Sequence, residues 1–196
     1  MVNKLLKRYL IIIPILSICY GQLTVGDTIP EYMGLPYCWN NDTESDSLYL
    51  HDYNGATNEL GQHSIIWLTI ITSWWPYCQS EAPFTEEMFQ IYKDSGLVVI
   101  GSGYQWDDPY SCEGWTETFG ISYPFINEDN GAGLGIWYNQ FYGEGIPKNV
   151  LINHNMEIIY ANSGTVWPST WISLIEEALD SCGVDCIPDA DGDGIL

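Results

Sequence analysis

The chain has 196 residues, of which 26 are acidic and five are basic, and its formal net charge at pH 7 is −21. This excess of negative charge excludes nucleic acids as partners, because the chain has too few cations to neutralise phosphates. Anionic membrane surfaces are excluded for the same reason.

The N-terminal 21 residues have the pattern of a signal peptide. Three basic residues precede an apolar run, residues 9–18, that is too short to span a bilayer. Cleavage after Gly21 would leave Lys93 and Lys148 as the only cations. We therefore expect a secreted or periplasmic protein with no membrane span.

A lipid anchor at Cys19 is the less favoured alternative. Residues 16–19 are a crude lipobox, but Ile18 is bulkier than the residue normally found before a lipidated cysteine. Beyond residue 21 we expect one domain of ordinary size, residues 22–181, followed by an acidic tail with two cysteines, residues 182–196.

Apolar patterning predicts alternating strands and helices in the domain. Residues 64–72 form a nearly continuous β-branched and aromatic run, typical of a strand buried on both faces at the middle of a sheet. The other predicted strands are 97–101, 123–126, 149–153 and 157–162, and the predicted helices are 76–95, 107–119, 134–142 and 169–179.

The order of these elements predicts an α/β fold with a central mixed sheet flanked by helices. A right-handed crossover makes strands 64–72 and 97–101 parallel neighbours. The strands 149–153 and 157–162 are separated by a short turn and form an antiparallel hairpin. Trp67, which lies on the central strand, is expected in the core.

Several segments together resemble redoxins, meaning the TlpA-type thioredoxin-like proteins and the alkyl hydroperoxide reductase/thiol-specific antioxidant family. Residues 25–30 resemble their Val-Gly-Asp-x-x-Pro opening, and residues 48–53 resemble their next strand. Residues 72–83 are similar to the active-site segment Ala-x-Trp-Cys-x-x-Cys-x-x-Glu-x-Pro, and residues 145–152 match a later loop and strand. The resemblance covers roughly residues 24–180.

The resemblance implies a thioredoxin-like fold with an N-terminal extension and an oxidoreductase or antioxidant activity in cell redox homeostasis. It implies partners that carry protein thiols or disulfides, or peroxides, and no cofactor. It also implies that Pro147 is a cis-proline that shapes the loop opposite the active site.

The chain departs from the family at the residue that matters most for redox chemistry. Trp75 occupies the position of the first, attacking cysteine, so the Cys-x-x-Cys motif is degenerate and only Cys78 remains. A dithiol/disulfide cycle within the motif is therefore excluded. The peroxiredoxin motif also fails, because Ile71 and Trp75 stand where its proline and threonine would be.

The remaining catalytic candidates are Cys78, Cys112 and Glu81. Cys78 is expected in the first turn of the helix after the central strand, where the helix dipole favours a thiolate. Cys112 is expected early in the helix after the neighbouring strand, at the same edge of the sheet. We hypothesise a Cys78–Cys112 disulfide, either structural or redox-active, with a spacing that resembles that of atypical two-cysteine peroxiredoxins.

Two other assignments stay open. Glu81 matches the family position that assists proton transfer, but a glutamate in a first helical turn is also favourable for the helix dipole alone. Cys182 and Cys186 form a local bridge, or one of them pairs with Cys38.

Aromatic residues around the motif supply a second hypothesis, a redox-inactive binding module for a protein or glycan partner. An aromatic platform of Trp74, Trp75, Tyr77, Tyr104 and Trp106 is predicted at the edge of the sheet. The candidate substrate-binding residues are Trp74, Trp75, Pro76, Tyr77, Ile146 and Pro147.

The acidic tail resembles the start of a thrombospondin type 3 or dockerin-like calcium repeat. Asp189, Asp191 and Asp193 have the spacing of the first ligands of a calcium loop, but the acid at position 12 is missing. We expect weak calcium binding at most, and a C-terminal module that is missing from this chain is one explanation of the pattern.

Overall fold

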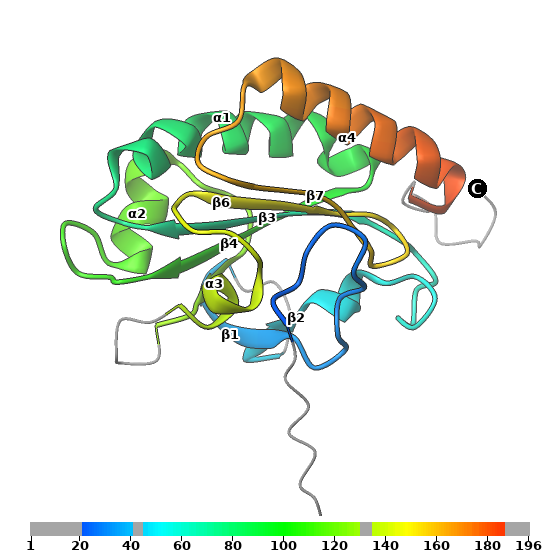
Figure 1. Ribbon diagram of the computed structural model, residues 1–196, viewed down its shortest axis with the longest axis horizontal. Coiled ribbons are helices and arrows are strands. Elements are labelled where there is room, and N and C mark those ends of the chain that lie inside the picture. Colours follow the sequence, from blue (N-terminus) through cyan, green and yellow to red (C-terminus); the bar gives the residue numbers. More distant parts are fainter. Residues whose placement is uncertain (1–20, 41–44, 130–134, 187–196) are drawn as a thin grey trace, which may run out of the picture.

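A computed structural model describes residues 21–40, 45–129 and 135–186 (Figure 1). A seven-stranded mixed sheet runs through the molecule in the order β2-β1-β5-β4-β3-β6-β7. The strands are β1 (Gly34–Trp39), β2 (Ser47–Tyr49), β3 (Ile65–Thr72), β4 (Leu97–Tyr104), β5 (Phe125–Asn127), β6 (Lys148–Ile152) and β7 (Ile158–Ser163). The helices are α1 (Pro76–Tyr92), α2 (Cys112–Phe119), α3 (Ile136–Gln140) and α4 (Pro168–Cys182).

The central position expected for the apolar run is confirmed. All eight residues of β3 are buried. β3 pairs in parallel with β4, as the crossover requires, and β6 and β7 form the predicted antiparallel hairpin. β3 also pairs antiparallel with β6. A strand with neighbours on both edges and helices or loops on both faces has no polar side to present, which explains its continuous apolar sequence.

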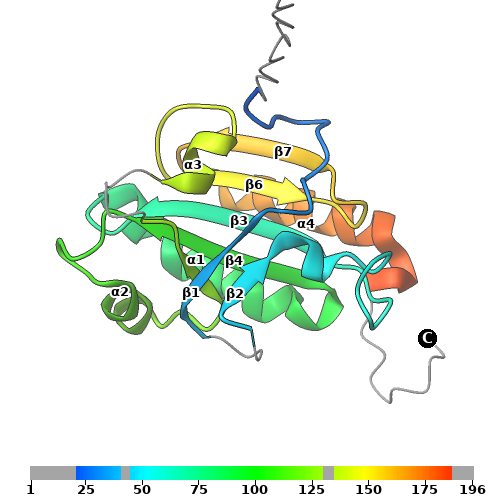
Figure 2. The same ribbon diagram turned by 90° about the horizontal axis from the view of Figure 1, so that it is seen from below.

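Each face of the sheet has its own core (Figures 1 and 2). On one face, α1, α2 and α4 cover a cluster that contains Trp67, Trp115 and Trp171, and the Trp67 and Trp171 rings stack with centroids 4.0 Å apart. On the other face, α3 and the N-terminal segment cover a second cluster that includes Trp137 and Phe141. The prediction that Trp67 belongs to the core is confirmed.

The start of the second helix differs from the prediction. The sequence places it near Asp107, but α2 begins at Cys112. Ser111 is the N-cap, and its hydroxyl accepts a hydrogen bond from the Gly114 amide at 3.0 Å. The Asp108–Pro109 bond is cis and belongs to the preceding loop. The sequence pattern around Pro109 is similar to that of a proline at the first position of a helix, which explains why the helix was predicted to begin too early.

The hypothesised bridge between Cys78 and Cys112 is wrong. Cys112 is bonded to Cys38, with their Cα atoms 6.2 Å apart, and Cys78 is a buried free thiol. β1 pairs with β5 and packs against α2, which brings Cys38 to the first turn of that helix. The strand that carries Cys38 was not predicted, so its proximity to Cys112 could not be foreseen.

The second disulfide joins Cys182 and Cys186, the local alternative. It connects the last residue of α4 to the 3-10 turn that follows, Gly183–Cys186. The buried Cys186 packs near Gly96, where a Cβ atom would lie 2.3 Å from the Cys186 carbonyl oxygen. The bridge therefore fixes the end of α4 against the turn that leads into β4.

Removing the Cys38–Cys112 bridge should destabilise the protein more than removing the local bridge. The first closes a separation of 74 residues and the second only 4. In the chain-entropy account these loops correspond to about 4 and about 2 kcal/mol of stability. Urea unfolding of the two double alanine variants measures this difference. Equal losses in the two variants would contradict it.

Candidate functional site

The surviving motif lies where β3 ends and α1 begins. Trp75 is the N-cap of α1, with an extended backbone at φ −85° and ψ 119°, and Pro76 is the first helical residue. Cys78 follows in the first turn, where its side chain points into the core and is 1% exposed. The cysteine that the sequence retained is thus the inner member of the motif.

Burial determines the acidity of the Cys78 thiol. Burial is the main cause that raises its pKa to about 12; the Thr72 backbone lowers the pKa, and the nearby Glu81 carboxylate raises it by a smaller amount. The helix dipole alone favours a thiolate, but desolvation is the larger effect here. The thiol is therefore protonated and weakly nucleophilic at neutral pH.

Trp75 fills the place of the attacking cysteine and joins an aromatic group on the surface. Its ring lies 5.4 Å from that of Trp74 and 5.8 Å from that of Tyr77, centroid to centroid. Trp74 and Tyr77 are exposed, whereas Trp75 is half-buried. The indole nitrogen of Trp74 donates a hydrogen bond to Gln105 Oε1 at 2.9 Å.

The predicted aromatic platform is smaller than expected. Tyr104 is buried on the opposite face of the sheet, where its ring contacts that of Tyr138. Trp106 is half-buried and packs flat over Gly103, where any Cβ atom would lie 2.0 Å from the indole. Of the five residues predicted for the platform, Trp74, Trp75 and Tyr77 lie together at the surface. We call this group of three side chains the rim.

The loop before β6 lies beside Cys78, as expected. The Ile146–Pro147 bond is cis. Pro147, Cys78 and Glu81 line one small enclosed cavity of about 10 Å³, enough for about one water molecule. The structure therefore brings together the motif thiol, the proline loop and the glutamate.

Glu81 is held in a buried hydrogen-bond chain. Its Oε1 accepts a hydrogen bond from Asn149 Nδ2 at 2.6 Å, and Asn149 Oδ1 accepts one from Trp67 Nε1 at 2.9 Å. Burial raises the pKa of Glu81 to about 7, against the lowering effects of Asn149 and of the Val166 backbone. A carboxyl group with this pKa can both hold and release a proton at neutral pH.

The raised pKa of Glu81 should make stability depend on pH. Between its ordinary value of 4.5 and about 7, the folded state keeps a proton that the unfolded chain has released. Stability is therefore lost as pH rises through this range. Glutamine at position 81 does not ionise. Relative to the Glu81→Gln variant, the free energy of unfolding of the natural protein should therefore fall by about 2–3 kcal/mol over this pH range. Urea unfolding at a series of pH values tests this, and parallel curves would contradict it.

A second buried charge network lies on the opposite face and was not predicted. Lys148 is 1% exposed, and its Nζ donates hydrogen bonds to the carbonyl oxygens of Tyr138 at 2.7 Å and Phe141 at 2.8 Å. Glu128 is fully buried, and its Oε2 accepts hydrogen bonds from the Trp137 and Tyr138 amides. Burial lowers the pKa of Lys148 to about 8 and raises that of Glu128.

This network attaches α3 and the segment after it to the sheet. Lys148 directly follows Pro147, so the network also supports the loop beside Cys78. The charge of Lys148 could have been noticed in the sequence, but a lysine at a strand start is usually exposed.

The described residues contain no group of three or more side chains that could hold a metal ion. None of the helices in these same ranges is long and apolar enough to cross a bilayer. Residues 1–20 of the predicted signal peptide, with the alternative lipid anchor at Cys19, lie outside the described residues. The predicted calcium ligands Asp189, Asp191 and Asp193 also lie outside them.

Two solved structures that are named as thiol-disulfide proteins share this architecture. A thiol-disulfide isomerase from Corynebacterium glutamicum superposes with a TM-score of 0.61 at 17% identity and covers 79% of this chain and 96% of its own. The thioredoxin domain of a thiol-disulfide oxidoreductase from Bacteroides vulgatus gives 0.58 at 13% identity and covers 79% and 99%. The chain has a thioredoxin-like fold. At these identities the likeness establishes the fold alone.

Sequence comparison gives relatives of the same thioredoxin-like class. The thiol-disulfide oxidoreductase ResA of Geobacillus kaustophilus is 24% identical over 144 residues, which are 74% of this chain and 72% of that protein. ResA of Geobacillus thermodenitrificans is 23% identical over 145 residues, with the same coverage. No protein-family model matches the chain. These similarities agree with the redoxin resemblance of the motifs.

Proposed function

We propose that this protein acts on polypeptides that carry thiols or disulfides, and exchanges disulfides with them at most through one thiol, Cys78. The observation that carries the proposal is the placement of Cys78 in the first turn of α1, beside Pro147 and Glu81. The printed name of the ResA relatives, thiol-disulfide oxidoreductase, supports the same class of partner.

A single thiol permits only one kind of exchange. The Cys78 thiolate attacks one sulfur of a partner disulfide, a mixed disulfide forms, and the other partner sulfur leaves as a thiol after it takes up a proton. A second partner thiol then attacks the mixed disulfide and regenerates Cys78. Glu81 is suited to accept the proton of Cys78, because both line the same small cavity.

A second candidate function is binding without exchange. The specific observation in its favour is that Cys78 is 1% exposed and that burial raises its pKa to about 12. A disulfide can reach this thiol only if Trp75 and its neighbours move aside. In this case the rim, together with the neighbouring Pro76, Ile146 and Pro147, would bind the partner and leave its redox state unchanged.

Export to the periplasm or beyond is part of the proposal. Its support is the signal-like sequence of residues 1–21 and the presence of two disulfides in the described part of the chain. Disulfides persist in oxidising compartments. A peroxide is retained as an alternative substrate of Cys78, although the chain has no arginine after residue 8 to activate one.

The test compares the natural protein with Cys78→Ser in insulin reduction, peroxide consumption and reaction with an aromatic disulfide reagent. We expect the reagent to modify the native protein slowly, to modify it rapidly in urea, and to leave Cys78→Ser unmodified. Insulin and peroxide turnover should be slight and should vanish in the variant. Activity that survives in Cys78→Ser would exclude the proposed chemistry. If Cys78 does not react with the reagent on the timescale of partner binding, binding without exchange is the function that remains.

A further inference from the structure

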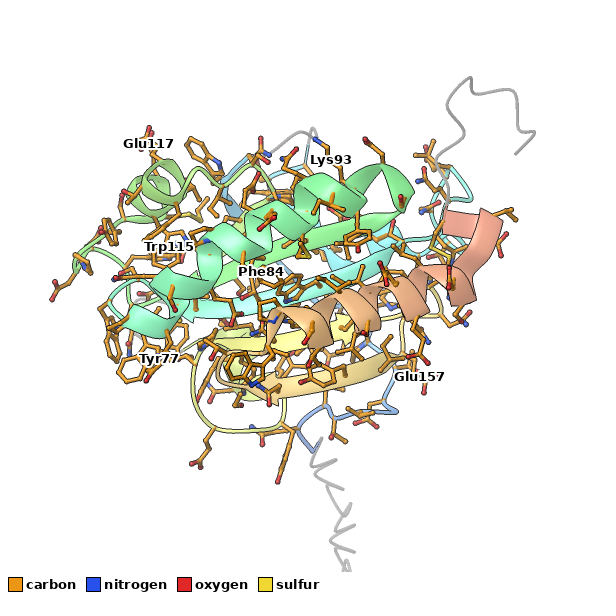
Figure 3. The ribbon with its side chains drawn as sticks, turned by 90° about the horizontal axis from the view of Figure 1, so that it is seen from above. Tyr77, Phe84, Lys93, Trp115, Glu117 and Glu157 are labelled. Carbon is orange, nitrogen blue, oxygen red and sulfur yellow. A yellow bond between two sulfur atoms is a disulfide. The ribbon has the colours of Figure 1, made fainter. Side chains whose placement is uncertain are left out.

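A groove runs beside the rim, between the first turns of α1 and the start of α4. We call it the α1–α4 groove, and its volume is about 420 Å³. Its lining consists of Tyr77, Ser80, Glu81, Phe84, Thr165, Val166, Trp167 and Pro168. Figure 3 shows Tyr77 at the start of α1 and Phe84 further along the helix, near α4.

The walls of the groove are aromatic and unusually exposed. The Trp167 side chain is 81% exposed and that of Tyr77 is 58% exposed, and Phe84 is half-buried. Trp167 is the N-cap residue of α4 and makes no capping hydrogen bond with its side chain. Several exposed aromatic side chains that line one groove commonly mark a binding surface.

A carboxyl group lies at the base of the groove. Glu81 is 6% exposed, and Asn149 occupies its Oε1. Its Oε2 is buried and has no hydrogen-bond partner among the described residues, although the Val166 backbone, which also lines the groove, lies near enough to lower the pKa of the carboxyl. A buried oxygen without a donor is costly, so a donor supplied by a ligand is favoured at this point.

The charge of the chain restricts what the groove can attract. After residue 21 the 26 acidic residues face only Lys93 and Lys148, and Lys148 is buried. The surface field therefore draws in cations and repels anions. Aromatic faces and a carboxyl group are also the partners that a guanidinium or ammonium group prefers.

We propose that the α1–α4 groove binds an arginine or lysine side chain of a partner polypeptide. The aliphatic stem lies between Tyr77 and Trp167, and the cationic group reaches the base at Glu81. This inference rests on the proposed function, because it gives the chemistry of the partner that the rim engages. A basic residue near the thiol or disulfide of the partner is what the groove selects.

The pH dependence of binding follows from the ionisation of Glu81. The groups that face its carboxyl are Cys78 on α1 and Tyr123, which precedes β5, and both are protonated at neutral pH. Glu81 ionises at a pH of about 7, so the cation should bind more tightly above this pH than below it.

The test uses two capped pentapeptides that contain no cysteine, one with a central arginine and the other with citrulline, which has the same shape without the charge. Tryptophan fluorescence at about pH 8 and about 0.15 M salt measures the affinity. We expect the arginine peptide to bind at least about tenfold tighter. Glu81→Gln should abolish this preference, and the matched control Glu31→Gln, an exposed acid on the other side of the sheet, should retain it.

A second variant keeps the test decisive if Glu81→Gln fails to fold. Trp167→Ala removes an exposed side chain, and it should weaken binding of both peptides at least about fivefold. The inference would be overturned if the arginine and citrulline peptides bound with equal affinity, or if the two glutamine variants changed the affinity equally. It would also be overturned if Trp167→Ala bound the peptides as tightly as the natural protein does. Because neither peptide carries sulfur, such a failure is separate from failure of the Cys78 chemistry.

Discussion

Replacing Trp75 by cysteine is expected to give the protein a dithiol activity that the natural chain lacks. Trp75 has the extended backbone of an N-cap, and Cys78 follows in the first helical turn, so the introduced thiol would lie at the exposed end of the motif with Cys78 behind it. A thiol at a helix N-terminus has a lowered pKa and is a good nucleophile. Cys78 would then resolve the mixed disulfide from within the protein.

We expect insulin reduction by Trp75→Cys to exceed that of the natural protein by about 100-fold or more, because resolution becomes intramolecular. Two controls separate this chemistry from a general opening of the site. Trp75→Ser removes the indole without adding sulfur and should stay near the natural level. The double variant Trp75→Cys/Cys78→Ser can attack but cannot resolve, and should stop at the mixed disulfide.

If Trp75→Cys gains no insulin-reducing activity, the missing cysteine is not the only difference from an active dithiol site. The proline loop and Glu81 beside Cys78 would then not be enough to support the exchange. A gain that persisted in the double variant would contradict the assignment of Cys78 as the resolving thiol. Both outcomes can be read from the same insulin assay.

Replacing Lys148 by methionine is expected to be the most destabilising single substitution considered. Methionine preserves the length of the side chain, but it leaves the buried carbonyl oxygens of Tyr138 and Phe141 without the Nζ donor. It also leaves the buried Glu128 without its neighbouring cation. Breaking such a network from one side costs about 3–5 kcal/mol.

The matched control variant for Lys148→Met is Lys93→Met. Both substitutions remove one positive charge from a very acidic chain, but Lys93 is exposed, and its Nζ donates to Gln90 Oε1 and lies 5.8 Å from the centre of the Phe89 ring. We expect Lys93→Met to change the free energy of unfolding by about 0.5 kcal/mol or less. Urea unfolding of the two variants measures the contrast. Similar effects would mean that net charge, and not the buried network, determines the loss.

The parts of the fold that the sequence predicts are those with strong local signals. β3 is a long apolar run and α1 begins at a proline, and both were placed within one residue at their starts. β1 gave no such signal, because Gly34–Trp39 contains a glycine and a proline and shows no alternation. Its pairing with β5 depends on a distant segment, and the position of Cys38 depends on that pairing.

The sequence predicted that three of the candidate residues lie together, but it did not predict their burial, and it wrongly paired Cys112 with Cys78. Motif spacing is sufficient to bring Cys78, Glu81 and Pro147 together, since these positions follow from the fold. Burial of Cys78 and exposure of Trp167 depend on how side chains pack around the rim, and no local pattern reports this. Lys148 is a similar case, because its burial depends on how α3 and the segment after it pack onto the sheet, although both lie close to it in the sequence.

The bridge between Cys38 and Cys112 also determines how the protein responds to proteolysis. It closes a covalent ring that includes β3, α1 and β4, and with them Trp75 and Cys78. A single backbone cut at any point between residues 39 and 111 opens the ring but leaves the two fragments tethered. One proteolytic cut in the turns after β2 would therefore not release the rim from the rest of the molecule.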